Sequence, residues 1–127
     1  MTEEWRPVVE GEFEVSNLGR VRSLDRVIKR GDNRMTLKGR IRKLSRNRHG
    51  YMVVKFYDRG PVLYVHHLVL TAFDGPRPAG MTHIRHLNGN PADNRLTNLA
   101  YGTPSENGRD MVAHGRSRNQ YTKAMNE

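Results

Sequence analysis

Residues 81–107 read MTHIRHLNGNPADNRLTNLAYGTPSEN, and this stretch decides the fold. Its start, 81–87, suits a β-strand, and the segment that follows, 88–94, is too rich in Asn, Gly and Pro to be regular. Residues 96–101 then return to apolar and β-forming types. We therefore expect two short strands joined by a polar loop.

The end of this stretch carries a signal for the start of a helix. Thr103 and Glu106 have the spacing of a capping box, in which each side chain bonds the backbone N–H of the other residue, and Pro104 suits the first helical position. We expect the helix to run to about His114, with Gly115 as the residue that ends it. The second half of the chain is therefore predicted as strand, loop, strand and helix.

A second helix and a hairpin are predicted upstream. Residues 65–73 carry one apolar stripe at helical spacing, and Gly75 and Pro76 follow it as a stop signal. Residues 51–57 and 62–64 are rich in β-formers and flank a turn, which predicts a β-hairpin.

Short strands are also predicted at 13–15 and 20–22, on either side of a turn-rich link. In both 20–22 and 40–42, two Arg residues flank one apolar residue. This period of two puts the Arg side chains on one face of a strand. Val21 and Ile41 are then expected to point the other way, toward a core.

Basic residues gather between positions 20 and 48, where twelve Lys and Arg are opposed by two Asp, and the whole chain carries a net charge of +9. A surplus of this size on a small chain points to a polyanionic partner, most commonly nucleic acid, although it can also serve solubility alone. The candidate nucleic-acid contacts are Arg20, Arg22, Arg40, Arg42, Lys43 and, on the upstream helix, His67.

The composition excludes several classes of protein. The chain has no cysteine, which rules out a disulfide framework and Cys-based zinc sites. No apolar run approaches the roughly 20 residues that span a bilayer. The first residues, MTEEW, lack the basic and apolar regions of a signal peptide. We therefore expect no membrane association and a protein that stays in the cytoplasm.

Three polar residues stand where phosphodiester hydrolysis could use them. His86 lies in the first strand of the 81–107 stretch, Asn98 follows the loop, and Asn107 lies in the first turns of the helix. The reaction needs a base that deprotonates water and a cation that neutralises the developing charge. A neutral imidazole can be the base, and an Asn oxygen suits Mg²⁺. Each residue alone could equally be an ordinary strand histidine or a polar residue at a helix start.

The order and spacing of these residues resemble the HNH (ββα-metal) endonucleases of phages and mobile introns. Three short motifs carry the resemblance: residues 86–90, 93–99 and 103–107. The helix at 65–73 looks like the one that precedes the nuclease core in that family. The front of the chain is similar to the small modular DNA-binding domain often found upstream of that core, in segments 4–7, 13–23 and 39–41. In all, the resemblance spans residues 3–115.

The resemblance implies an α+β fold and a DNA endonuclease that depends on Mg²⁺ or Mn²⁺, uses no small-molecule cofactor and acts in the cytoplasm of a bacterial host. It implies that His86 is the general base, that Asn98 ties down the loop and orients His86, and that Asn107 binds the metal. It also divides the chain into three parts: a small, basic, antiparallel β segment that binds DNA (1–64), the ββα-metal finger with its preceding amphipathic helix (65–115), and a basic, disordered tail (116–127).

The chain departs from the family pattern at Arg85, where many relatives place an Asp or Asn that serves as a second metal ligand. A guanidinium cannot bind a cation. Either Asn107 is the single protein ligand, with water and DNA phosphate completing the shell, or His83 or Asp93 substitutes. Arg85 would then clamp a phosphate oxygen. A catalytically degenerate module that only binds DNA or RNA is the alternative function.

The histidines and the mode of cleavage each allow more than one interpretation. His83 and His86 could form a zinc pair, but no further ligand has matching spacing. One of His66 and His67 is expected to pack or cap, with a DNA contact as the second possibility. A monomer with one site would nick, whereas a double-strand break needs a homodimer or two successive events. The target site is open, and so is the biological role, which could be intron homing, phage genome processing or defence.

Overall fold

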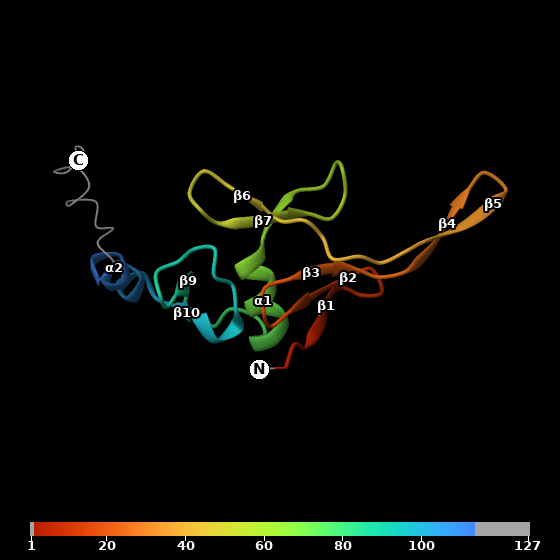
Figure 1. The fold of residues 1–127 in the computed structure, drawn as a ribbon. Coiled ribbons are helices and arrows are strands. Elements are labelled where there is room, and N and C mark those ends of the chain that lie inside the picture. Colours follow the sequence, from red (N-terminus) through yellow and green to blue (C-terminus); the bar gives the residue numbers. More distant parts are fainter. Residues whose placement is uncertain (1, 114–127) are drawn as a thin grey trace.

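The structure, a computed structural model, describes residues 2–113 of the 127. The described part combines four small antiparallel sheets with two α-helices, so the chain is α+β, as the sequence predicts. Figure 1 shows helix α1 (Val65–Asp74) near the centre, with the sheets around it. Neither described helix is long and apolar enough to cross a bilayer. The expected helix end at His114 and Gly115 and the tail at 116–127 lie outside the described residues.

Three strands form the first sheet, in the order β1 (Trp5–Val9), β2 (Phe13–Ser16) and β3 (Val21–Ser23). Strands β2 and β3 confirm, to within a residue, the two strands predicted on either side of the turn. Val15 and Val21 face each other across the antiparallel pair and are fully buried. The burial of Val21 therefore matches the prediction from its alternation with Arg20 and Arg22.

The segment around Ile41 does not form the strand that the sequence predicts. One isolated bridge joins Ile41 to Arg22, and the backbone N–H groups of Arg40 and Arg42 donate to carbonyls of β3 at 3.1 and 2.7 Å. The segment therefore only lines the edge of the first sheet. Ile41 remains 48% exposed there, and the prediction that it points into a core is wrong.

A two-stranded arm, β4 (Arg26–Arg30) and β5 (Asn33–Leu37), extends away from the body in Figure 1. Gly31 begins its turn with φ of 61°, a conformation that favours glycine. Every residue of β5 is exposed, and Val27 of β4 is 63% exposed. A hairpin of this kind is held mainly by its backbone ladder, because it buries little apolar surface.

A further sheet has the order β6 (Ser45–Arg46), β7 (Met52–Lys55) and β8 (Val62–Tyr64). Strands β7 and β8 confirm the predicted hairpin, with Val53 opposite Tyr64. Strand β8 runs directly into α1.

Helix α1 confirms the predicted amphipathic helix and joins the sheets through one core. Its residues Val65, Val69 and Leu70 are fully buried, and the helix contacts β1, β2, β7 and β8. Burial of such a side chain contributes about 1.5–3 kcal/mol. Gly75 ends the helix with φ of 84°. Core residues come from both sides of position 64: Phe13, Val15, Val21, Val54, Phe56, Val65, Val69, Leu70 and Leu99.

The remaining elements are β9 (His83–His86), the 3₁₀ turn η1 (Leu96–Asn98), β10 (Leu99–Gly102) and α2 (Pro104–Ala113). Strands β9 and β10 are antiparallel, with His86 opposite Leu99. The strand predicted at 96–101 is therefore correct only from Leu99 onward. Residues Leu96–Asn98 coil instead, because the Asn98 backbone N–H bonds the Arg95 carbonyl at 2.8 Å.

The capping box at the start of α2 forms as the sequence predicts. The Glu106 backbone N–H donates to Thr103 Oγ1 at 3.2 Å, and the Thr103 backbone N–H donates to Glu106 Oε1 at 3.0 Å. These bonds, with that of the Thr103 backbone first, hold the pKa of Glu106 below its ordinary value. The helix packs against β9 and β10, the two strands that precede it.

Candidate active site

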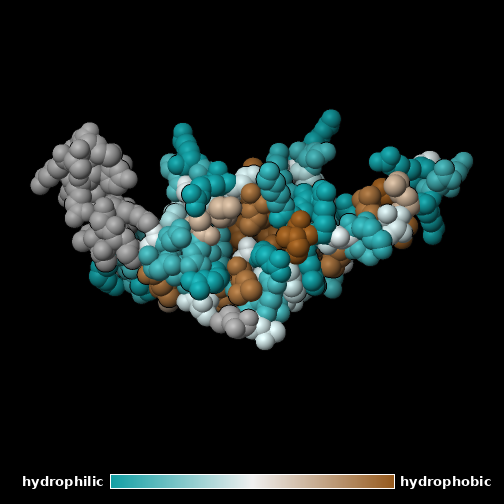
Figure 2. Space-filling view, viewed as in Figure 1, coloured by the Kyte–Doolittle hydropathy of each residue, from teal (hydrophilic) through white to brown (hydrophobic). Residues whose placement is uncertain are grey.

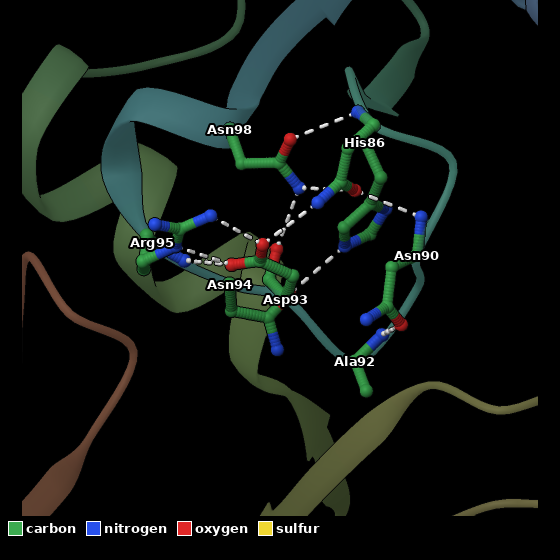
Figure 3. Close-up of polar contacts among 8 residues, drawn as sticks. His86, Asn90, Ala92, Asp93, Asn94, Arg95 and Asn98 are labelled. Atoms are coloured by element: carbon green, nitrogen blue, oxygen red, sulfur yellow. Dashed lines mark hydrogen bonds and ion pairs between the residues drawn. The ribbon is translucent and has the colours of Figure 1, made fainter.

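His86 is the last residue of β9, and its side chain is buried against the polar loop. Its ring Nε2 lies 2.8 Å from Oδ1 of Asn94, which is also buried (Figure 3). An amide oxygen can only accept, so Nε2 carries the proton in this pair and Nδ1 carries the lone pair. The contact therefore selects one tautomer of the ring, which a general base requires.

Asn98 holds the loop through three hydrogen bonds. Its Oδ1 accepts from the Asn88 backbone N–H at 2.9 Å, and its Nδ2 donates to Asn88 Oδ1 at 3.0 Å and to the Asp93 carbonyl at 2.9 Å. Figure 3 shows how these bonds draw the two ends of the loop together. The hydrogen bond that orients the His86 ring is accepted by Asn94, a residue that is not among those predicted from the sequence.

Asp93, which the sequence offered as a substitute metal ligand, is engaged within the loop. Its carboxylate accepts from Arg95 Nη2 at 2.7 Å and Nε at 2.8 Å, and from Asn88 Nδ2 at 2.8 Å. The hydrogen bonds from Arg95 are the main reason that the pKa of Asp93 falls to about 2. Asp93 therefore acts as a carboxylate that stiffens the loop beside His86.

Arg85 is tied to helix α2. Its Nε and Nη2 donate to the two oxygens of Asp110 at 2.7 and 3.1 Å, and its Nη1 lies 3.5 Å from Glu106 Oε2. The Asp110 carboxylate raises the pKa of Arg85 above its ordinary value. Gly102 of β10 leaves room for the Arg85 stem, because a Cβ there would lie 2.5 Å from Arg85 Cδ. Asp110 is not among the site residues predicted from the sequence, although its distance of three residues from Asn107 puts both on one helical face.

Asn107 lies half-buried in the second turn of α2, between Glu106 and Asp110 in sequence. Among the described residues, no three His, Cys, Asp or Glu side chains are grouped so that they could hold a metal ion. The carboxylates nearest in sequence to Asn107 are those that bind Arg85. The donor set therefore fits a hard cation held by the Asn107 amide oxygen with substrate oxygens and water, as Mg²⁺ commonly is. The described residues do not provide a preformed site in which protein ligands alone surround the ion.

His83 does not share a face of the strand with His86. The two residues are three apart in β9, so their side chains leave opposite faces of the strand. His83 Nδ1 lies 2.9 Å from Thr82 Oγ1. The geometry therefore gives no support to a zinc pair, and it leaves His83 on the face that carries Arg85.

The two histidines of α1 take different positions. His66 is largely buried, and its ring centroid lies 5.1 Å from that of His86. Burial is the main reason that the pKa of His66 falls to about 4. His67 is exposed and borders a surface hollow of about 570 Å³ between β1, β8 and α1.

Part of the basic surface is neutralised within the first sheet. Arg20 forms an ion pair with Glu3, and Arg22 forms one with Glu14 at 2.6 Å. Both guanidinium groups also lie over the Trp5 ring, at 5.6 and 4.1 Å from its centroid. The structure thus brings Arg20 and Arg22 together, but with their charges already balanced.

The other side chains predicted to contact nucleic acid are less engaged in ion pairs. Arg40 and Lys43 are exposed, whereas Arg42 Nη2 donates to the Lys55 carbonyl at 2.9 Å. The β4–β5 arm adds exposed Lys29 and Arg34, which face each other across the hairpin. Figure 2 shows hydrophilic groups on this arm beside an apolar patch. The arm and the segment that follows it therefore carry exposed positive charge.

Two family models match the chain: the NUMOD4 motif over residues 3–57 and HNH endonuclease over residues 63–109. Among solved structures, the chain is similar to one that describes DNA binding and cleavage by the HNH homing endonuclease I-HmuI, with 25% sequence identity and a TM-score of 0.67. That similarity covers 98% of this chain and 68% of the other. No curated protein matches the chain. The first matched stretch runs from β1 to β7, and the second runs from β8 into α2.

Proposed function

This chain belongs to the HNH endonucleases, and from that premise we propose that it cleaves DNA with a divalent metal ion and with His86 as the general base. One observation carries the proposal. A buried histidine at the end of β9 is held in a single tautomer by Asn94, and helix α2, which carries Asn107, packs against the same strand. The similarity to a DNA-cleaving homing endonuclease supports DNA rather than RNA as the substrate.

His86 accepts the proton of the attacking water at Nδ1, because Nε2–H is engaged with Asn94. The ring becomes an imidazolium in this step. Asn94 Oδ1 then stabilises the positive charge through the same hydrogen bond, without any movement of the loop. The three bonds of Asn98 keep the loop, and with it Asn94, at a fixed distance from the strand.

Asn107 is the residue that would hold the metal ion. Its amide oxygen suits Mg²⁺ or Mn²⁺, and the remaining positions would be filled by water and a DNA phosphate. When bound, such an ion would neutralise charge on the phosphate and on the leaving oxygen. Of the other candidates, Asp93 is committed to Arg95 and His83 lies against Thr82, so Asn107 remains the single protein ligand in this proposal.

Arg85 acts, in this proposal, mainly by holding α2 against β9. Its two shortest hydrogen bonds are made to Asp110, so a DNA phosphate would have to compete with that carboxylate for the guanidinium. The long contact to Glu106 leaves Nη1 as the donor that a phosphate could reach. A role as phosphate clamp is therefore secondary to a role as a tether that positions Asn107.

DNA would be gripped by the exposed cations of the arm and of the segment after it. Lys29, Arg34, Arg40 and Lys43 carry charge that no ion pair within residues 2–113 balances, unlike that of Arg22. Phosphate contacts of this kind give affinity without sequence preference and make binding sensitive to salt.

Supercoiled plasmid provides the test. Wild-type protein with Mg²⁺ or Mn²⁺ should convert it to relaxed circles if one strand is cut and to linear DNA if both are cut, and EDTA should stop the reaction. His86→Ala should bind the plasmid but leave it supercoiled. DNA binding without cleavage under any metal would instead support the alternative function, a degenerate DNA-binding module.

A further inference from the structure

A second histidine packs against the ring of the proposed base. His66, in the first turn of α1, has its ring centroid 5.1 Å from that of His86, with the two planes at 78°. Tyr51 and Tyr64 also pack against His66, each with its ring centroid 5.3 Å from that of His66. Tyr51 also contacts His86 directly, at 5.9 Å. The base is therefore part of a cluster of four rings contributed by β8, α1, β9 and the residue before β7.

Stability does not explain a histidine at this position. His66 Nδ1 is buried and has no hydrogen-bond partner among the described residues. An unsatisfied buried polar atom costs stability, and such an atom in a folded protein calls for an explanation. A carbon ring of similar shape would fill the same space without that cost.

The charge state of His66 suits a neighbour of a base. Desolvation first, then the nearby His86 and His67, lower its pKa to about 4, so it is neutral at pH 7. The rings packed around it are those of Tyr51, which precedes β7, of Tyr64 in β8 and of His86 in β9. A neutral ring can stay in contact with His86 when that residue gains a proton, whereas a charged one would repel it.

We propose that His66 is a positioning residue for the general base: its ring packs edge-to-face on His86 and fixes the plane in which Nε2 meets Asn94. Asn94 alone constrains one edge of the ring, and a ring held only there can turn away and break the hydrogen bond that selects its tautomer. Contact with the His66 ring removes that freedom. This inference rests on the proposed role of His86.

Two variants separate packing from hydrogen bonding. His66→Ala removes the ring, and His66→Phe keeps a ring of similar shape but has no nitrogen. We expect His66→Ala to lower the single-turnover rate on bound DNA by about 10-fold to 10²-fold, since small misplacements of a catalytic group have effects of this order. His66→Phe should restore most of the rate. Leu68→Ala, a truncation on the same helix that faces the core, controls for loss of stability and should leave the rate unchanged.

Nitrogen NMR of histidine-labelled protein gives a readout that does not depend on cleavage. Wild type and His66→Phe should show His86 as one tautomer, protonated at Nε2, whereas His66→Ala should show a mixture. The inference is overturned if His66→Ala keeps the single tautomer, or if His66→Phe is as defective as His66→Ala, because the nitrogen rather than the ring would then matter. A chain that cleaves nothing would refute the proposed function, while the tautomer of His86 would still test the role of His66.

Discussion

Replacing His66 by phenylalanine should change how stability depends on pH. His66 titrates at about 4 in the folded protein, compared with an ordinary value of 6.5 for the pKa of histidine. Between these values the unfolded chain binds a proton at His66 that the folded chain does not. Lowering the pH through this window therefore favours unfolding. The free energy of unfolding is unaffected by His66 above pH 6.5, and it falls as the pH drops from 6.5 toward 4.

The size of the effect follows from the same interval. At about 1.36 kcal/mol per pH unit, the distance from 6.5 to about 4 corresponds to at most about 3.4 kcal/mol. This is a large share of the roughly 5–15 kcal/mol by which a typical domain is stable. In His66→Phe the contribution is absent, so the variant should gain stability relative to wild type as the pH falls from 7 to 4.

Urea unfolding followed by the fluorescence of Trp5, the single tryptophan, measures this difference at each pH. Other groups that titrate in the same range cancel when wild type and variant are compared. Parallel stability curves for wild type and His66→Phe would refute the reasoning, because they would mean that His66 titrates normally in the fold.

Three further predictions concern the metal, the tether and the DNA contacts. Asn107→Ala should raise the Mg²⁺ or Mn²⁺ concentration needed for half-maximal cleavage while DNA affinity in a gel-shift assay stays near wild type; an unchanged metal requirement would remove Asn107 as the ligand. Arg85→Ala should loosen α2 and lower cleavage by roughly 10²-fold, and hydrogen exchange should show faster exchange in α2; full activity would mean that Arg85 has no part in the site. Replacing both Arg40 and Lys43 by Gln should reduce the slope of log affinity against log salt by about two, whereas Arg22→Gln should change it less because Glu14 already balances that charge; equal effects would show that the ion pair opens on DNA.

Local patterns in the sequence predicted much of the fold. The Thr103 and Glu106 capping box, the stripe of α1 and the β7–β8 hairpin each depend on neighbours within a few residues, and each is confirmed. The β4–β5 arm has a comparable local signal, since Gly31 and Asp32 form a turn between two five-residue strands. That hairpin was nevertheless missed, because the density of basic residues is the more prominent feature of the stretch.

Features that depend on distant partners could not be predicted in the same way. Arg22 looks like an open cation in its own segment, but Glu14 reaches it from the neighbouring strand. Ile41 alternates like Val21, yet it lies at a sheet edge that nothing in the described part of the chain covers.

The candidate site shows the same limit. The residues proposed as base, loop tie and metal ligand come from the resemblance to the HNH family, but the contact between Asn94 and the His86 ring depends on how the loop closes. Asp110 is likewise paired with Arg85 only because α2 packs on β9. Polar loops offer several competing hydrogen-bond partners, and only the folded geometry selects among them.

The single-turnover rate of DNA cleavage by wild type and His86→Ala, with all DNA bound and Mg²⁺ saturating, tests the central claim most directly. Loss of a general base should lower this rate by about 10²–10⁴-fold while the dissociation constant for DNA stays the same. A His86→Ala rate equal to that of wild type would contradict the account, because another group would then have to activate the water.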